Sequence, residues 1–286
     1  GTTVTQTIPV LNPNELRSFT FTTNADLSAY IDYTLDVWVN YPPDNYNNND
    51  SVLNYSFHNS PVISSYPYLE RFESSNGNWY TKGFNSSWEW GTPASTIINK
   101  AANGSKAWVT SLTGNYNANE LSYLYSPCFD LTGLAQPVLS FSHIFELEDN
   151  CDCDYHWVEY STDGGVTWLK LGAAGSGTNW YNNTAYQRWQ LSKTKWHVAS
   201  IDVPGNTSGV RFRFVLKSDG GVNYEGVGID DIHVFDKATI YTGLDVTVPP
   251  QNVSGTNWID FNVGGKRIAS INPNGQNLGS TGVNIY

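Results

Sequence analysis

The chain has 286 residues, of which 14% are charged and 14% aromatic, and its formal net charge is −11. This acidity argues against nucleic-acid binding, which needs Lys and Arg to displace counterions from phosphates. No apolar run reaches the roughly 18 residues of a membrane-spanning helix. The 25 glycines, the 13 prolines and the many Asn, Ser and Thr residues favour strands and turns, so the sequence predicts an all-β protein.

The first 66 residues predict a few short strands. Apolar side chains alternate from Tyr33 to Val39, which indicates a half-buried strand, and Phe19–Thr22 and Val52–Phe57 are expected to flank it. The stretch 11–52 resembles the second half of an immunoglobulin-like module of adhesion-related bacterial surface proteins, so we expect residues 1–66 to be the C-terminal part of such a module. Asp50-Ser51-Val52 is similar to a short O-glycosylation acceptor of such bacteria, which makes Ser51 a glycosylation candidate.

Residues 67–237 contain enough strand patterns for a complete β-sandwich. In Val210–Lys217, apolar and cationic side chains alternate, so one face of that strand is expected in the core and the other in water. Eight or nine such antiparallel strands are best closed as two packed sheets, a jelly roll. The predicted strands are Tyr68–Glu73, Ala107–Leu112, Leu121–Ser126, Val138–Phe145, Trp157–Tyr160, Trp168–Leu171, Trp196–Val203, Val210–Lys217 and Gly228–Phe235.

The stretch His156–Leu171 predicts a β-hairpin. Its turn contains Asp163-Gly164-Gly165, and glycine adopts the positive φ of such turns without steric cost. The segment from Ser161 to Trp168 resembles the Asp box of secreted β proteins. In that motif the short Asp and Ser side chains accept hydrogen bonds from local N–H groups, while the tryptophan packs beneath the turn.

Several motifs of residues 67–237 occur in the order typical of one family. They are Phe72-Glu73, Trp88-Glu89-Trp90-Gly91, Ser126-Pro127-x-Phe129-Asp130-Leu131, Pro137-Val-Leu-Ser-Phe141, the Asp163 hairpin and Gly228-Ile-Asp-Asp231-Ile232. The series resembles the MAM and reelin-repeat type of jelly roll, especially the version in large surface proteins of bacteria that use type IX secretion. This resemblance implies an extracellular adhesive role, export by type IX secretion and contact with secretion machinery.

The same resemblance implies a calcium ion that joins the first strand to the last, here through Glu73 and the pair Asp230 and Asp231. Calcium takes six to eight oxygen ligands, so carbonyl groups and water must complete the shell. Asp230 is the better ligand candidate, because it falls on the core-facing side of Gly228–Phe235, where an unpaired carboxylate is costly. The alternative is that Glu73 and Asp230 cap turns or pair with an arginine.

A second acidic stretch runs from Glu146 to Asp154. It could hold another calcium ion or a pair of catalytic carboxylates, but Asn150 cannot ionise, so a solvated loop with a local ion is the favoured interpretation. Its acidic residues are Glu146, Glu148, Asp149, Asp152 and Asp154. The chain's three cysteines, Cys128, Cys151 and Cys153, are too few for a disulfide scaffold, and a link from Cys128 to Cys151 or Cys153 is a candidate pairing.

Aromatic residues in Gly-, Asn- and Ser-rich stretches are the candidate ligand-binding residues. Rings exposed there would stack on sugars or on a partner protein, although we expect about half of them to be buried. They are Trp88, Trp90, Trp180, Tyr181 and Trp189. The chain's five histidines show no spacing typical of a metal site or a catalytic triad, and no nucleophile elbow, zincin or phosphate-loop motif is present.

Residues 238–286 predict the start of a further β-sandwich module, with a hairpin formed by Trp258–Val263 and Arg267–Ile271. The lack of methionine and of a signal peptide, and the incomplete modules at both ends, indicate a piece of a longer secreted or cell-surface protein. The sequence thus predicts a non-catalytic, calcium-stabilised adhesion or attachment region that binds a glycan or protein ligand. The alternatives are an accessory carbohydrate-binding region of a secreted hydrolase, and a glycosidase that uses Glu148.

Overall fold

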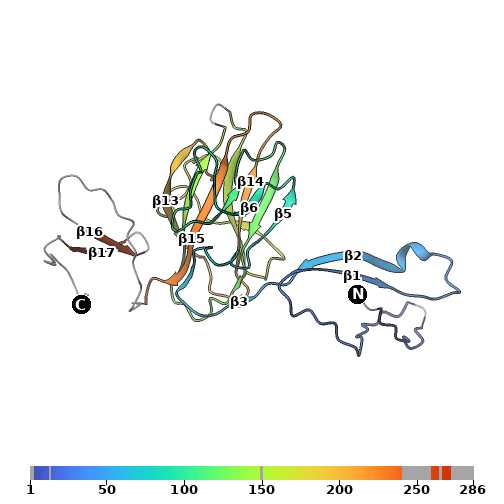
Figure 1. The fold of residues 1–286 in the computed structure, drawn as a ribbon. Coiled ribbons are helices and arrows are strands. Elements are labelled where there is room, and N and C mark those ends of the chain that lie inside the picture. Colours follow the sequence, from blue (N-terminus) through green and yellow to red (C-terminus); the bar gives the residue numbers. More distant parts are fainter. Residues whose placement is uncertain (1–2, 13, 149–150, 240–258, 264–265, 272–286) are drawn as a thin grey trace. The chain divides into compact units, whose positions relative to one another are not determined.

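A computed structural model describes residues 3–12, 14–148, 151–239, 259–263 and 266–271 (Figure 1). The chain divides into two compact units, Gly1–Ser60 and Pro61–Tyr286. Strands account for nearly all regular structure in the described part, with a single short 3₁₀ helix, η1 (Asn47–Asn49), so the all-β prediction is confirmed. No helix among these residues has the length and apolar character needed to cross a membrane.

The first unit contains a two-stranded antiparallel hairpin of β1 (Asp32–Trp38) and β2 (Ser51–His58). Two of the three predicted strands are thus confirmed, whereas Phe19–Thr22 forms no strand. The prediction of a half-buried strand was wrong, because a single hairpin provides no second layer to cover its apolar side chains. Val37 is 46% exposed and Trp38 53%. The immunoglobulin-like character of residues 1–66 stays a prediction.

The second unit contains two large sheets. One has the strand order β13-β10-β15-β7-β6, with β4 also paired to β15; the other has the order β12-β11-β14-β8-β5. The first sheet consists of β4 (Tyr68–Glu70), β6 (Trp88–Gly91), β7 (Ala107–Thr110), β10 (Pro137–Glu146), β13 (Lys193–Asp202) and β15 (Gly226–Asp236). The second consists of β5 (Tyr80–Phe84), β8 (Leu121–Tyr125), β11 (Tyr155–Ser161), β12 (Leu169–Lys170) and β14 (Arg211–Lys217).

The core lies between these two sheets. The ring centroids of Phe141 on β10 and Phe214 on β14 are 4.8 Å apart in an edge-to-face contact, which joins the layers directly. Val158 and Phe212 add fully buried side chains from the five-stranded sheet, and Ile229 adds one from the other. The predicted two-layer β-sandwich is therefore confirmed, and Figure 1 shows β13 and β15 of one sheet to the left of β14 and β5 of the other.

All nine strands predicted between residues 67 and 237 are present, with boundaries that shift by a few residues. The sequence interpretation missed β5 and β6, which lie in stretches that look like loops because of their Gly, Asn and Ser content. It also missed the short parallel pair of β3 (Val62–Ile63) and β9 (Cys128–Phe129). The domain boundary after residue 66 stays a prediction, although β3 already lies in the second unit.

Two further strands follow the sandwich. β16 (Ile259–Val263) and β17 (Lys266–Ile271) are antiparallel, which confirms the predicted hairpin. Trp258, expected at its start, lies outside the described residues, as does the turn expected at 272–275.

Candidate functional site

The outward side of the five-stranded sheet carries a continuous row of aromatic and charged side chains. Cross-strand pairing aligns Lys170 with Glu159, Glu159 with Arg213, Arg213 with Tyr125 and Tyr125 with Tyr80. Side chains alternate between the two faces of a strand, so these residues point away from the core that holds Val158, Leu124 and Phe214. A second row, two residues away along each strand and on the same face, contains Trp157, Val215, Tyr123 and Lys82. A third row, two residues further, contains Tyr155, Lys217, Leu121 and Phe84. We call this surface the sheet face.

Arg213 is at the centre of the sheet face. Its Nε lies 2.6 Å from Glu159 Oε2, and a terminal nitrogen donates to the Tyr125 hydroxyl at 2.8 Å. The guanidinium carbon is 4.3 Å from the ring centroids of both Tyr123 and Trp168. Cation–π contacts of this kind contribute on the order of 0.5–2 kcal/mol each, so the arginine and the rings hold one another in place.

Glu159 is held from two sides. While Oε2 accepts from Arg213, the Trp157 indole N–H donates to Oε1 at 2.7 Å. The Lys170 ammonium is 5.2 Å from the centroid of the Trp157 ring. The side chain of Glu159 therefore has few lone pairs left for a ligand, whereas the cations around it keep N–H groups to donate.

The edges of the sheet face are more open. Phe84 is 68% exposed and Leu121 36%. Tyr80 and Tyr125 stack with ring centroids 5.0 Å apart, and both remain partly exposed. Partly exposed rings held by fixed neighbours present flat apolar surfaces at little cost in conformational entropy, which suits stacking on a sugar ring or packing on a partner protein.

The turn that covers one end of the sheet face has the hydrogen bonds expected from its sequence. The Asp163 carboxylate accepts from the Val166 N–H at 3.0 Å and from the Thr167 N–H at 2.9 Å. Ser161 Oγ accepts from the Gly165 N–H at 2.8 Å, and the Trp168 indole donates to the Gly165 carbonyl at 2.9 Å. The turn thereby fixes Trp168 under Arg213.

Four of the five aromatic candidates from the sequence are buried, so their interpretation as exposed ligand-binding rings was wrong. Trp88 is 6% exposed, Trp180 1%, Tyr181 6% and Trp189 1%. The polar atoms of Trp180, Tyr181 and Trp189 donate to backbone carbonyls inside the protein, for example Trp180 to Leu171 at 2.9 Å. The loops that carry three of these rings pass over the edge of the sandwich and fill its core. Trp90 is half-buried, and the Lys106 ammonium lies 4.6 Å from its ring centroid.

The three calcium candidates converge on one loop. Glu73 accepts from the Ser105 and Lys106 N–H groups at 2.9 Å, and Asp230 accepts from the Ala102 and Asn103 N–H groups at 3.0 Å. Their oxygens already serve the backbone of residues 102–106. In two groups of described residues, three candidate ligand atoms lie within 4.8 Å of one another. Neither group contains Glu73, Asp230 or Asp231.

Asp230 and Asp231 nevertheless place two carboxylates next to each other on β15. Asp230 is fully buried, and burial together with the charge of Asp231 raises its pKa to about 7. Burial also raises the pKa of Asp231, although Arg71 Nε lies 3.7 Å from its carboxylate. β4 and β15 are hydrogen-bonded directly, so the sheet itself joins the first strand of the sandwich to its last.

The second acidic stretch places Glu148 beside Asp154 and Asp219, with one oxygen of each within 4.8 Å of the others. Burial raises the pKa of Glu148, and the charges of Asp154 and Asp219 raise it further. Asp154 is 1% exposed and binds the Tyr116 hydroxyl and the Asp219 N–H, so no substrate reaches it as the chain is folded. Asp149 and Asn150 lie outside the described residues.

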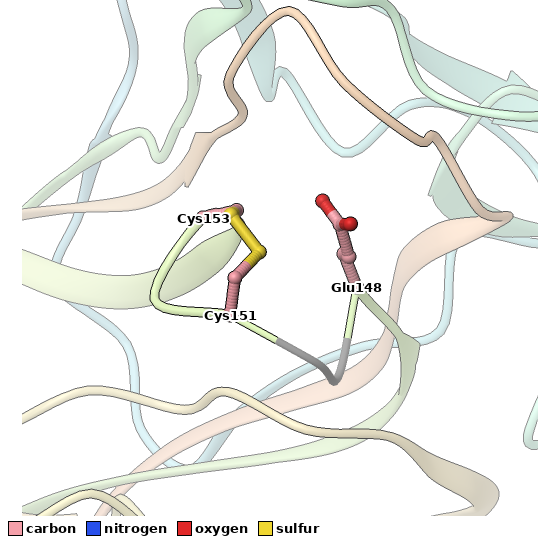
Figure 2. Close-up of side chains that lie close together, drawn as sticks. All are labelled: Glu148, Cys151 and Cys153. Atoms are coloured by element: carbon pink, nitrogen blue, oxygen red, sulfur yellow. A yellow bond between two sulfur atoms is a disulfide. The ribbon is translucent and has the colours of Figure 1, made fainter.

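Cys151 and Cys153 form a disulfide, and Figure 2 shows the Glu148 carboxylate beside it. Cys128 is a free, half-buried thiol on β9 whose Sγ is 3.8 Å from the Ser208 carbonyl. The candidate link from Cys128 to Cys151 or Cys153 is therefore not formed, because the two cysteines separated by one residue pair with each other. The predicted glycosylation residue, Ser51, is exposed at the start of β2.

Three histidines that look scattered in the sequence meet at one end of the core. The ring centroids of His143 and His197 are 4.0 Å apart, and those of His143 and His156 are 5.7 Å apart. His143 and His156 are fully buried, and their ring nitrogens have no hydrogen-bond partner within the described part of the chain. Burial lowers the pKa of all three, to about 3 for His156 and about 4 for His197.

Comparison with known proteins gives one curated relative and several structural neighbours, while no family model matches the chain. The chain is 32% identical over 172 residues to bacillopeptidase F of Bacillus subtilis (strain 168), which covers 60% of this chain and 11% of that protein. The chain thus corresponds to about a ninth of that relative's length.

Among solved structures, the carbohydrate-binding module TmCBM61 in complex with β-1,4-galactotriose has a TM-score of 0.40 at 14% identity, over 60% of this chain and 100% of that one. The K1 cleaved adhesin domain of Lys-gingipain from Porphyromonas gingivalis W83 has a TM-score of 0.39 at 15% identity, over 60% and 99%. At such low TM-scores these similarities assign neither a ligand nor a function to the chain.

Proposed function

We propose that the β-sandwich is a non-catalytic ligand-binding module of a larger secreted or cell-surface protein, and that the sheet face binds its ligand, a surface glycan. The observation that carries this proposal is the arrangement around Arg213, where one cation is fixed between Tyr123, Tyr125 and Trp168 on the outer side of a rigid sheet. Sites on sheet strands hold their side chains more accurately than sites on loops, which favours recognition of a defined ligand.

The experiment that tests the function is a binding survey of the whole chain on immobilised polysaccharides and on a glycan array. The proposal expects binding that Tyr125→Ala reduces at least about tenfold, because stacking on an aromatic ring contributes on the order of 1–2 kcal/mol. Tyr55→Ala is the matched control, because Tyr55 is an exposed aromatic residue of the first unit, 59% exposed. Equal losses with both variants, or binding that Tyr125→Ala leaves intact, would refute this use of the sheet face.

The kind of protein that contains this module is a separate proposal, which rests on sequence similarity. Similarity to a segment of bacillopeptidase F supports an accessory module attached to a secreted hydrolase, here a peptidase, in addition to the adhesive role. Export by type IX secretion, and contact with its machinery, are proposals that rest on the sequence resemblance alone. A glycosidase would need Asp154 to be accessible beside Glu148; cleavage of a polysaccharide by the chain that Glu148→Gln abolishes would reinstate that alternative.

Calcium stabilisation is also a proposal. The adjacent carboxylates of buried Asp230 and partly exposed Asp231 support it, as does Glu73, which accepts hydrogen bonds from the same loop. A cation would have to share these oxygens with the N–H groups of residues 102–106, and loop carbonyls and water would complete its shell. Thermal unfolding after chelation tests it: added calcium should raise the melting temperature of the wild-type chain and leave Asp231→Asn unchanged, and an equal response of both would reject the site.

A further inference from the structure

We propose that the ligand of the sheet face is an acidic glycan, one that carries carboxylate or sulfate groups. This inference rests on the proposed function, because it concerns the same surface. The sheet face carries mostly cations, whereas the chain as a whole is acidic.

Among the described outward positions of the five strands, five carry a cation and one carries a carboxylate. The cations are Lys82, Lys170, Arg211, Arg213 and Lys217, and the carboxylate is Glu159. The sequence has 15 Lys and Arg and 26 Asp and Glu, so the other 10 cations are outnumbered by 25 acids. A positive patch on an acidic protein attracts an anionic ligand. The acidic remainder of the surface repels it, so the ligand is expected to bind at the patch.

The cations differ in how a ligand would meet them. Lys170 and Lys217 are exposed, and Lys82 and Arg213 are half-buried. Arg211 is buried and donates to the Ser126 carbonyl and the Tyr80 hydroxyl, so it contributes charge rather than a contact. Neighbouring strands lie about 4.8 Å apart, which places Lys170 roughly 10 Å from Arg213 across the sheet. The cations thus surround the aromatic centre instead of forming one cluster.

The hydrogen-bonding groups also favour an anion over a neutral sugar. Neutral sugar hydroxyls are commonly recognised by carboxylates, which accept hydrogen bonds, and by amide groups, which both accept and donate. Within the described part of the sheet face, no outward strand position holds Asn, Gln or Asp, and both oxygens of Glu159 already accept from Arg213 and Trp157. The surface therefore offers mainly donors, and carboxylate and sulfate groups are acceptors only.

Nucleic acid is the other polyanion that aromatic and cationic side chains on a sheet can bind. The net charge of −11 disfavours it, because a strand with a phosphate at every nucleotide is repelled by the acidic remainder of the chain. A glycan that is charged at every second sugar or less often carries less charge over the same length. The sheet face therefore fits an acidic polysaccharide better than a nucleic acid.

The experiment measures affinities of the whole chain, by calorimetry in 50 mM and 500 mM NaCl, for polygalacturonate, neutral β-1,4-galactan, heparin and a single-stranded oligothymidylate. The inference expects an acidic glycan to bind at least about tenfold more tightly than the galactan at low salt, and to lose most of that advantage at high salt as the charges are screened. Binding of heparin but not polygalacturonate would identify sulfate, and the reverse would identify carboxylate; either supports the inference.

Charge variants separate this inference from the proposed function. Lys170→Gln and Lys217→Gln should each weaken acidic-glycan binding about 2- to 5-fold, as expected for an exposed ion pair, while the affinity for galactan stays the same. Lys195→Gln is the matched control, because Lys195 is an exposed lysine of β13 in the other sheet. Galactan binding that equals or exceeds acidic-glycan binding, with Tyr125→Ala still harmful, would overturn the ligand class and keep the binding face. Tightest binding to oligothymidylate would overturn the inference, and no binding to any probe would overturn both.

Discussion

Arg213 and Glu159 face each other on β14 and β11, and two guanidinium nitrogens reach the same carboxylate oxygen, Nε at 2.6 Å and a terminal nitrogen at 2.5 Å. Both side chains are largely covered, 15% and 16% exposed, by the rings of the sheet face. A pair that is fixed and partly desolvated contributes more than an ion pair in open solvent. It organises the charge around which we expect the ligand to bind.

Removing one partner of this pair should destabilise the sandwich. Glu159→Gln leaves Arg213 partly buried without its carboxylate, and we expect the free energy of unfolding to fall by about 1–2 kcal/mol. A double-mutant cycle with Arg213→Met measures the coupling by urea denaturation and should give about 1 kcal/mol. A coupling energy of zero would mean that the two side chains are only neighbours.

The buried tryptophans should matter for stability and not for binding. Trp189→Ala removes a fully buried ring that contacts Phe141 and Trp180, so we expect the free energy of unfolding to fall by about 3–5 kcal/mol. Trp189→Phe should keep the protein folded at 20 °C and bind the ligand as wild type does. Lost affinity in a fully folded Trp189→Phe variant would return this residue to the ligand-binding candidates.

The Asp163 turn gives a prediction with a pH dependence. Hydrogen bonds from the Ser161 and Thr167 side chains hold the pKa of Asp163 well below its ordinary value of 3.8. Its contribution to stability is therefore complete above that value and is lost as the pH falls toward the lower folded pKa. Asp163→Ala should lower the melting temperature at pH 7 relative to Thr162→Ala, and the difference should shrink below pH 4. A constant difference at all pH values would contradict this origin.

The buried histidines give a second pH dependence of stability, in a higher range. Their folded pKa values lie below the ordinary value of 6.5, because burial and their mutual repulsion, together with Lys193, disfavour protonation. As the pH falls, these histidines are protonated in the unfolded chain before they are protonated in the folded one. The stability that the neutral histidines confer is therefore complete above pH 6.5 and falls toward pH 4. The raised pKa of Asp230 acts in the opposite sense. The contribution of the histidines is therefore measured by comparing the pH dependence of stability between a histidine variant and the wild-type chain.

Chemical denaturation at pH 7.5, 6 and 5 makes this comparison. The variant in which His143→Phe and His156→Phe are combined should lose less stability between pH 7.5 and 5 than the wild-type chain. His58→Gln in the first unit serves as a control that should leave the pH profile of the sandwich unchanged. A double variant with the wild-type slope would show that these imidazoles do not titrate on unfolding.

The sequence predicts the strands better than it predicts the site. The period of two in Val210–Lys217 correctly places Phe212 and Phe214 in the core and Arg213 outside. The same alternation in β8 and β11 would have placed Tyr123, Tyr125, Trp157 and Glu159 outward. What the local pattern cannot supply is the strand order, which brings residues 125, 159 and 213 into one row by pairings between distant segments.

The errors have a common physical origin. Trp180 and Trp189 lie in stretches rich in Gly, Asn and Ser, which predict exposed loops, yet these loops cover the open edge of the core and bury both rings. Burial there is decided by tertiary packing, which local composition does not encode. The same holds for the histidines: His143 and His197 are paired across β10 and β13, and His156 arrives from the opposite sheet.

The most direct test of the binding face is a crystal structure of the chain with the shortest acidic oligosaccharide that binds it. We predict sugar rings over Tyr125 and Trp157, with the anionic groups within hydrogen-bond distance of Arg213 or Lys170. An oligosaccharide seated on the six-stranded sheet or in the loops, with the sheet face bare, would contradict the account.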